Sequence, residues 1–337
     1  MKISVVIPCR NEVKHIRECV SAIFASELSP GTALSVYVVD GMSDDGTREL
    51  VLELMHEYPG LALVDNVKQL TPFAFNLGIY QQKADYIQIV GARQVLSANY
   101  LQKCIDILSA DQQIWCVGGN VENVYLNETG RIISVAMSTA FGMGLGNFRT
   151  LNESGFTDTV GTPMYPYWVF EKIGFFDEEL IRNQDDDFNF RVTQAGGKIY
   201  FEASIYVKYY VRGNFSGLYR QFYQYGYWKV FVNRKHKAVT TMRQLVPPAF
   251  VLFIFLLPFT ILLSKWLFFP MLAIFGIYLL MALYFSVKKG KGLSESAGIF
   301  KTFPILHFSY GAGYLKGILD FIILGTKPSD KQKRLSR

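Results

Sequence analysis

The fold of this chain is decided by residues 38–47, which read Val38-Val39-Asp40-Gly41-Met42-Ser43-Asp44-Asp45-Gly46-Thr47. A buried apolar strand ends there on the carboxylate of Asp40, and a turn rich in Asp, Gly and Ser leads into a helix. Open α/β sheets bind ligands at the carboxyl ends of their strands, where Asp40 can accept hydrogen bonds from a base or a ribose. The stretch therefore favours a nucleotide site over an ordinary strand-to-helix loop.

Two other short apolar runs lead to the same edge. Residues 3–7 form a β-branched run that we expect Pro8 to stop, and a helical pattern follows. Residues 86–90 form another strand, which delivers Gly91-Ala92-Arg93. Three strands that end in polar turns predict an α/β domain with a mostly parallel, Rossmann-like sheet and one ligand-binding edge.

The net charge of the 337-residue chain is +6, from 34 Lys and Arg against 28 Asp and Glu. This balance suits either nucleic acid or an anionic membrane surface. The basic residues gather at 234–237, 288–291 and 327–337, and each cluster borders a hydrophobic stretch. We therefore expect a membrane partner and no nucleic acid.

Two uncharged stretches predict a transmembrane helical hairpin. Residues 245–263 and 266–287 each lack a charged side chain, and each reaches the roughly 20 residues needed to cross a bilayer. Basic clusters flank both outer ends, so the positive-inside rule places the N-terminal domain in the cytosol and Lys265 outside. We expect a multi-pass protein of the inner (cytoplasmic) membrane.

A third hydrophobic segment, residues 299–324, carries charged side chains, and both of its ends are basic. It is predicted as an interfacial or re-entrant helix, with a third crossing as the alternative. Before the hairpin, residues 215–232 hold eight aromatics in 18 residues, which is typical of a membrane-interface belt. We expect four divisions: a catalytic domain at 1–210, an interface segment at 211–244, the hairpin at 245–290, and a third helix with a basic tail at 291–337.

Several motifs in this order resemble glycosyltransferase family 2, which has the GT-A fold. The nearest likeness is to membrane-attached enzymes that build succinoglycan-type exopolysaccharides on lipid carriers. The motifs are Pro8-x-Arg10-Asn11-Glu12, Val39-Asp40, Ser43-x-Asp45-Gly46-Thr47, Thr71-Pro72-x-Ala74-x-Asn76-x-Gly78, Phe170 to Asp177, and Asp185 to Arg191.

The resemblance implies roles position by position. Asp185 matches the catalytic base, and its place at the N-terminus of a predicted helix stabilises the charged carboxylate. The donor-binding set implied by the resemblance is Pro8, Arg10, Asn11, Glu12, Asp40, Ser43, Asp45, Asn76, Gly91, Ala92 and Arg93. The acceptor side is Gln221, Tyr225, Trp228 and Lys229.

The chain departs from this family at Gly91-Ala92-Arg93. Relatives carry Asp-x-Asp or Asp-Ala-His there, and these side chains hold Mg²⁺ or Mn²⁺ against the donor diphosphate. Glycine has no side chain and arginine stays protonated, so neither can be a metal ligand. Arg93 can replace the cation, because a guanidinium pairs with phosphate. No metal ligand is assigned.

The resemblance implies an inverting hexosyltransferase that transfers a sugar from a nucleoside diphosphate, expected to be UDP, to a lipid-linked saccharide. Asp185 would deprotonate the attacking hydroxyl. Two alternatives stay open. The chain could be a catalytically silent membrane subunit that binds nucleotide sugar or glycolipid. It could also transfer sugar to polyprenyl phosphate, a reaction that needs no base.

Overall fold

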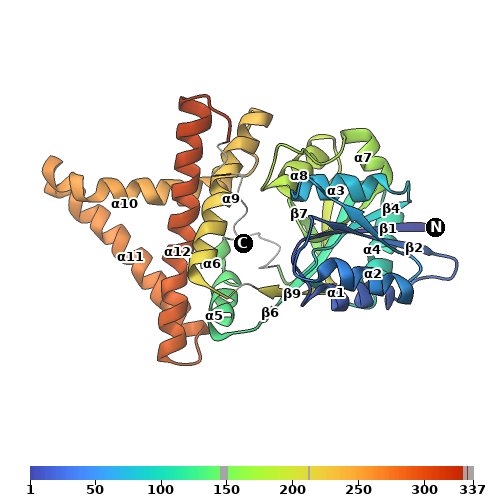
Figure 1. The fold of residues 1–337 in the computed structure, drawn as a ribbon. Coiled ribbons are helices and arrows are strands. Elements are labelled where there is room, and N and C mark those ends of the chain that lie inside the picture. Colours follow the sequence, from blue (N-terminus) through green and yellow to red (C-terminus); the bar gives the residue numbers. More distant parts are fainter. Residues whose placement is uncertain (145–150, 212, 329–331, 333–337) are drawn as a thin grey trace. The chain divides into compact units, whose positions relative to one another are not determined.

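The computed structural model describes residues 1–144, 151–211, 213–328 and 332 (Figure 1). Most of the predicted basic tail lies outside the described residues. The chain forms two compact units, Met1–Val124 with Gly146–Tyr210, and Tyr125–Leu145 with Val211–Arg337. Residues 125–145 group with the C-terminal unit, and the predicted domain divisions stay predictions.

The first unit is built on a mixed sheet, within which nine strands are described in the order β3-β2-β1-β4-β8-β6-β9-β5, with β7 paired to β9. Strands β1 to β4 are parallel, and β1, β2 and β4 carry predicted site residues at their ends. Their bounds are β1 Lys2–Cys9, β2 Ala33–Asp40, β3 Leu61–Asp65 and β4 Tyr86–Ile89. The others are β5 Gln94–Leu96, β6 Ile114–Tyr125, β7 Gly155–Thr157, β8 Gly161–Pro166 and β9 Lys198–Val211.

Helices cover both faces of this sheet (Figure 1). Alternate side chains of β1 point to opposite faces, so Val5 and Ile7 join one apolar core and Val6 joins the other. The first core includes helices α1 Ile16–Phe24, α2 Thr47–Glu57 and α4 Tyr100–Ala110. The second includes α3 Thr71–Tyr80, α7 Tyr167–Ile173 and α8 Gln184–Gln194. The predicted α/β architecture is confirmed.

The expectation that Pro8 stops the first strand is wrong, because β1 continues to Cys9 in register with Asp40. The N–H of Val90 donates to the carbonyl of Val6, so even-numbered residues of β1 face β4. The ladder with β4 ends before Pro8. A backbone N–H at position 8 would therefore have no partner in β4, so proline can occupy this position without breaking a hydrogen bond of the sheet.

The second unit is helical, and α12 lies among most of its other helices. Helix α5 packs the apolar side chains of Ile132 and Ala136 against Ile299 and Phe303 of α12, which explains why residues 125–145 group here. The bounds are α5 Glu128–Met137, α6 Ala140–Met143, α9 Phe215–His236, a 3₁₀ turn Met242–Leu245, α10 Val246–Leu263, α11 Lys265–Lys289, α12 Leu293–Gly317 and a π-helical turn Ile318–Ile323.

Helices α9 and α12 meet through glycines. A Cβ atom on Gly226 would lie 2.0 Å from the carbonyl oxygen of Tyr310, and one on Gly313 would lie 2.0 Å from that of Tyr223. Trp228 in α9 has no exposed surface, and its ring lies edge-on to those of Tyr227 and Phe231. Several rings of this aromatic segment are buried within the helical unit, namely Phe222, Tyr227 and Trp228. A membrane-interface role for the segment stays a prediction.

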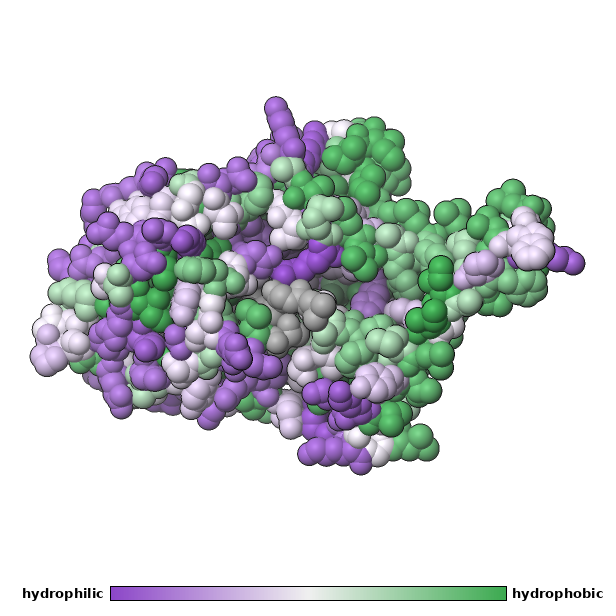
Figure 2. Space-filling model, turned by 180° about the vertical axis from the view of Figure 1, so that it is seen from behind, coloured by the Kyte–Doolittle hydropathy of each residue, from purple (hydrophilic) through white to green (hydrophobic). Residues whose placement is uncertain are grey.

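Helices α10 and α11 are the two described helices that are long and apolar enough to cross a membrane. They join at Ser264, which caps the start of α11, and they diverge from that point (Figure 1). Their apolar side chains are largely exposed, with Trp266 91% exposed, and Figure 2 shows this apolar arm. The two helices indicate membrane attachment. Whether α12 is interfacial or crosses the membrane stays a prediction.

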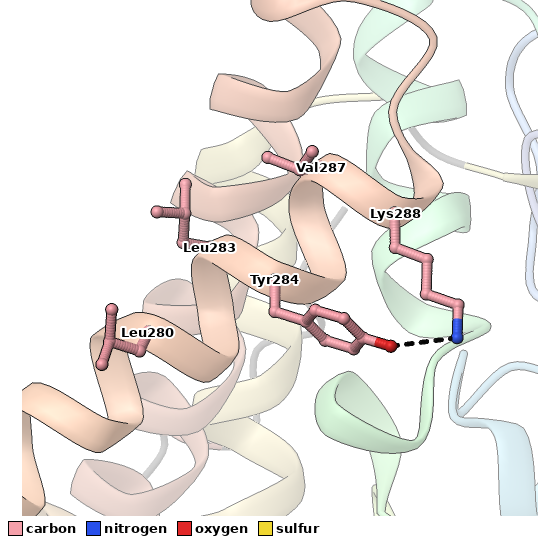
Figure 3. A pocket seen from close by; sticks show the side chains of 5 residues that line it. All are labelled: Leu280, Leu283, Tyr284, Val287 and Lys288. Carbon is pink, nitrogen blue, oxygen red and sulfur yellow. Dashed lines mark hydrogen bonds between the residues drawn. The ribbon is translucent and has the colours of Figure 1, made fainter.

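A shallow hollow lies along α11 near its C-terminus (Figure 3). Its lining is apolar except at one end, where the Nζ atom of Lys288 donates to the hydroxyl of Tyr284 at 3.2 Å. A lysine that reaches toward a tyrosine hydroxyl at the end of an apolar helix is typical of a membrane boundary. The hollow belongs to the apolar surface of α11 and has no catalytic group. It is lined by Leu280, Leu283, Tyr284, Val287 and Lys288.

Candidate active site

The loops after β1 and β2 are joined by hydrogen bonds. The backbone N–H of Asn11 donates to the hydroxyl of Ser43 at 2.8 Å, and its amide group donates to Asp44 at 2.8 Å. The N–H of Glu12 donates to the hydroxyl of Thr47 at 2.9 Å. The predicted residues Asn11, Glu12 and Ser43 therefore lie together, in a loop pair that their own contacts hold rigid.

Asp45 strengthens the same loop pair. It accepts from the backbone N–H groups of Val13 at 3.3 Å and Thr47 at 3.1 Å. Partial burial raises the pKa of Asp45, but hydrogen bonds from Thr47 and Val13 outweigh it, so the pKa lies below its ordinary value. The carboxylate stays charged and acts as a brace between the loops.

Three non-glycine residues in the predicted site loops adopt left-handed backbone. They are Asn11 with φ 55°, Met42 with φ 57° and Asn183 with φ 59°. Such a conformation is uncommon for non-glycine residues, and it clusters at functional sites when the surroundings hold it in place. The turns after β1 and β2 and the turn before Asp185 share this feature.

Asp40 lies at the end of β2 with no exposed surface. Its carboxylate accepts from the backbone N–H of Ser43 at 2.9 Å, from the hydroxyl of Ser43, and from Nη1 of Arg48 at 2.8 Å. The Nη2 atom of Arg48 donates to Asp65, at the end of β3, at 2.8 Å. Arg48 covers the carboxylate in this arrangement, and the contact between Asp40 and a base stays a prediction.

Arg93 follows β4 and pairs with Glu12, which follows β1. Its Nε atom lies 2.8 and 2.7 Å from the two carboxylate oxygens of Glu12. For the two terminal nitrogens of Arg93, no hydrogen bond is found among the described residues. Burial and then the positive charge of Arg93 lower the pKa of the nearby His15. The guanidinium is therefore held at one atom while its other donors are available.

Arg10 lies beside the same edge, and its side chain covers Gly41, where a Cβ atom would be 3.1 Å from Cδ of Arg10. Its Nε atom is buried and has no hydrogen-bond partner in the described part of the chain. Among those residues Arg10 also makes no ion pair. Arg10 and Arg93 thus bring two guanidinium groups to the ends of β1 and β4.

Residues 91–93 do not fit a metal ion. Gly91 offers no ligand, Ala92 is buried and apolar, and the guanidinium of Arg93 lies against Glu12. Within the described ranges, no group of three or more His, Cys, Asp or Glu side chains could hold a metal. The side chains at this edge instead supply positive charge themselves.

Asn76 lies in α3 and is buried. Its amide nitrogen donates to the carbonyl of Phe176 at 2.9 Å and to Glu178 at 3.0 Å, and its oxygen accepts from the N–H of Phe176 at 3.0 Å. These contacts use the side chain to hold the segment after α7. Asn76 therefore has a structural role, and its donor contact stays a prediction. Pro8 likewise lies within β1.

Helix α8 begins at Gln184 and ends at Gln194, as the acidic first turn and the following glycines predict. Asp185 is exposed, whereas Asp187 is buried and pairs with Arg191 at 3.0 Å. Arg191 also donates to the carbonyls of Ile173 and Phe175, both at 2.8 Å. The buried pair anchors α8, and the first turn presents Asp185 at the surface.

The predicted acceptor-side residues all lie in α9, within the C-terminal unit. Gln221 donates to the hydroxyl of Tyr225 at 2.7 Å. Trp228 has no exposed surface and donates to the carbonyl of Gln332 at 3.3 Å, and Lys229 is also buried. Trp228 and Lys229 therefore have packing roles in this unit, and contact of Gln221 and Tyr225 with an acceptor stays a prediction.

Arg48 and Asp65 were missed by the sequence reading. Asp65 ends an apolar run, residues 61–65, that is one more short strand, and its register places it beside Asp40. That strand-ending carboxylate could have been found by the reasoning used for Asp40. Arg48 gave no such signal, because an arginine in the first turn of a helix usually faces solvent.

A model of glycosyl transferase family 2 matches residues 4–173, just over half of the chain. The chain belongs to glycosyltransferase family 2. The matched range of this family model contains the strands and loops that hold Arg10, Glu12, Asp40 and Arg93. The protein is a glycosyltransferase.

Two characterised relatives of this glycosyltransferase are similar over much of its length. One is the "Dolichyl N-acetyl-alpha-D-glucosaminyl phosphate 3-beta-D-2,3-diacetamido-2,3-dideoxy-beta-D-glucuronosyltransferase" of Methanococcus voltae, 29% identical over 240 residues, 69% of this chain and 74% of the relative. The other is the succinoglycan biosynthesis protein ExoA of Rhizobium meliloti, 25% identical over 322 residues, 94% of this chain and 95% of the relative.

A solved structure shares the fold of this family 2 glycosyltransferase. The mannosyltransferase PcManGT from Pyrobaculum calidifontis, in complex with GDP-Man and Mn²⁺, matches with a TM-score of 0.60 at 17% identity. The match covers 94% of this chain and 86% of that protein. The similarity confirms the GT-A architecture.

Proposed function

We propose that this glycosyltransferase moves a sugar, with inversion, from a nucleoside-diphosphate sugar to a hydroxyl of a lipid-linked saccharide. The reaction would serve the synthesis of a cell-surface polysaccharide. The names of the two relatives support this class of acceptor and pathway. The observation that carries the proposal is the pair of guanidinium groups, Arg10 and Arg93, at the ends of β1 and β4.

The strand order supports a diphosphate site at these strand ends. Strand β1 lies between β2 and β4, so the chain crosses over in opposite directions on its two sides. Ligands of open α/β sheets bind at such a switch point, outside the carboxyl ends of the strands. Arg10 and Arg93 would pair with the diphosphate and stabilise the charge that develops as it leaves.

Asp185 would act on the acceptor. Its carboxylate takes the proton from the acceptor hydroxyl, and the oxygen attacks the anomeric carbon from the face opposite the diphosphate. The new glycosidic bond forms as the bond to the diphosphate oxygen breaks. One displacement of this kind inverts the anomeric configuration.

Replacing Arg93 by Ala should weaken binding of UDP by roughly tenfold, and binding to the wild type should survive EDTA. Charge-assisted hydrogen bonds contribute about 1.5 to 3 kcal/mol each, and Arg93 supplies them in place of a metal. Calorimetric titration of the full chain in detergent, with EDTA or with Mn²⁺, measures both effects.

The matched control for this titration is Arg17→Ala. Arg17 also lies against carboxylates, Glu53 and Glu57, at 2.8 and 2.9 Å, but on the outer surface of α1 and α2. It should bind UDP as the wild type does. Binding that disappears in EDTA, together with normal binding by Arg93→Ala, would show that a metal carries the charge.

We also propose that the protein is a multi-pass inner-membrane protein whose catalytic unit faces the cytosol. A cysteine placed at Lys265, between the two apolar helices, should react with an impermeant maleimide outside the membrane, while one at the exposed Glu27 should not. The free native cysteines, Cys9, Cys19, Cys104 and Cys116, are buried, so they should contribute little labelling. Labelling at Glu27 and protection at Lys265 would reverse the topology.

A further inference from the structure

Arg48 occupies an unfavourable position for a cation. It is the second residue of α2, which starts after Gly46, and the N-terminus of a helix carries partial positive charge. Two carboxylates compensate, because Arg48 bridges Asp40 and Asp65 at 2.8 Å each. The helix N-terminus disfavours a cation, yet the tertiary structure holds Arg48 there. Such a conflict is expected at a functional site.

Burial decides which member of this group a ligand can touch. The Asp40 side chain has no exposed surface, whereas that of Arg48 is 26% exposed. Both oxygens of Asp40 already accept hydrogen bonds from Ser43 or Arg48. Asp40 therefore orients Arg48, and Arg48 presents the donors at the end of β2.

The charges divide the strand-end surface into two parts. At the ends of β1 and β4, Arg10 and Arg93 bring two positive charges, and the carboxylate of Glu12 pairs with Arg93. The carboxylates of Asp44 and Asp45 belong to the turn after β2, although they accept from Asn11 and Val13. At β2 and β3, Asp40 and Asp65 outnumber Arg48, and the Asp65 side chain is 58% exposed. A diphosphate is attracted to the first part and repelled by the second, which would leave the uncharged base of the donor over Arg48.

We infer that Arg48 reads the base of the donor nucleotide and selects uracil or guanine over adenine. This inference rests on the function proposed above. A guanidinium has five N–H donors, of which two are used on Asp40 and Asp65. The remaining donors match ring carbonyl oxygens, O4 of uracil or O6 of guanine. Adenine has no ring carbonyl and presents an amino group there, which is itself a donor.

The test is calorimetric titration of the full chain in detergent micelles with UDP, GDP and ADP. The wild type should bind UDP or GDP about tenfold or more tightly than ADP. Arg48→Lys keeps a positive charge beside buried Asp40 but loses the planar donors, so its preferred nucleotide should bind about tenfold more weakly. Its binding of ADP should stay unchanged, because the diphosphate contacts persist.

Two further variants separate base recognition from folding. Arg17→Lys alters an arginine that also bridges two carboxylates of α2, and it should change neither affinity nor preference. Asp65→Asn removes one exposed anchor of Arg48, so it should reduce the base preference while the thermal unfolding temperature stays close to that of the wild type. Thermal unfolding of Arg48→Lys shows whether this variant is folded. If Arg48→Lys does not fold, the nucleotide preference of Asp65→Asn tests the inference instead.

Several outcomes would overturn the inference. Equal binding of ADP and UDP or GDP by the wild type would show that Arg48 selects no base. Unchanged or tighter binding of UDP by folded Arg48→Lys would show that Arg48 only shields Asp40. If the wild type binds none of the three nucleotides, the proposed function fails and this inference falls with it, whereas loss of base preference alone leaves the proposed function standing.

Discussion

Asp185→Asn is expected to slow sugar transfer by on the order of 100- to 10,000-fold with little change in donor affinity. Asparagine keeps the size of the side chain but cannot accept the proton of the acceptor hydroxyl. Asp185 is exposed at the first turn of α8, and the proposed donor contacts lie on other strands and loops. Transfer from radiolabelled UDP-sugar in native membranes gives the rate, and calorimetry gives the affinity for UDP.

The matched control is Asp186→Asn, the next carboxylate of the same helix turn. It makes the same change of charge, so an effect due only to charge at the helix N-terminus would appear in both variants. We expect a much smaller loss of transfer for Asp186→Asn. Near-normal turnover by Asp185→Asn would contradict the base assignment and favour a phosphate acceptor. Absence of transfer by the wild type, with nucleotide binding intact, would favour a silent subunit.

Gly313→Ala is expected to destabilise the helical unit by about 1 to 3 kcal/mol. The added Cβ atom would lie 2.0 Å from the carbonyl oxygen and 3.0 Å from the Cα atom of Tyr223 in α9. Backbone atoms cannot move aside as a flexible side chain can, so the two helices must separate. Thermal unfolding in detergent micelles should show a lower midpoint.

Gly276→Ala in α11 is the matched control for this prediction. It makes the same change inside a helix of the same unit, but a Cβ atom there has nothing within 4 Å. Alanine favours a helix over glycine by about 1 kcal/mol, so Gly276→Ala should be neutral or stabilising. Equal midpoints for the two variants would show that α9 and α12 do not depend on this contact.

The sequence by itself determined the strands and helices that build the site. An apolar run followed by a polar turn is a local signal, and it identified β1, β2 and β4, although β1 continues two residues beyond its predicted end. Parallel strands share one edge, so those ends had to meet. The acidic first turn and the closing glycines likewise predicted α8, and the two uncharged stretches predicted α10 and α11. Each of these signals lies within a short stretch of chain.

Only the tertiary structure decided which partner each side chain takes. Arg93 is 81 residues from Glu12, and Asp40 and Asp65 become neighbours through the register of β2 and β3. The same holds for Asn76, which bonds to a segment 100 residues away, and for Trp228, whose indole N–H donates to a carbonyl 104 residues away. A strand end can be read from local sequence, but a charged group at that end pairs with whichever opposite charge the fold brings within reach. Packing therefore decided that Arg48 is the exposed donor and Asp40 the buried acceptor. Burial and strand register are properties of the assembled sheet, and local sequence does not contain them.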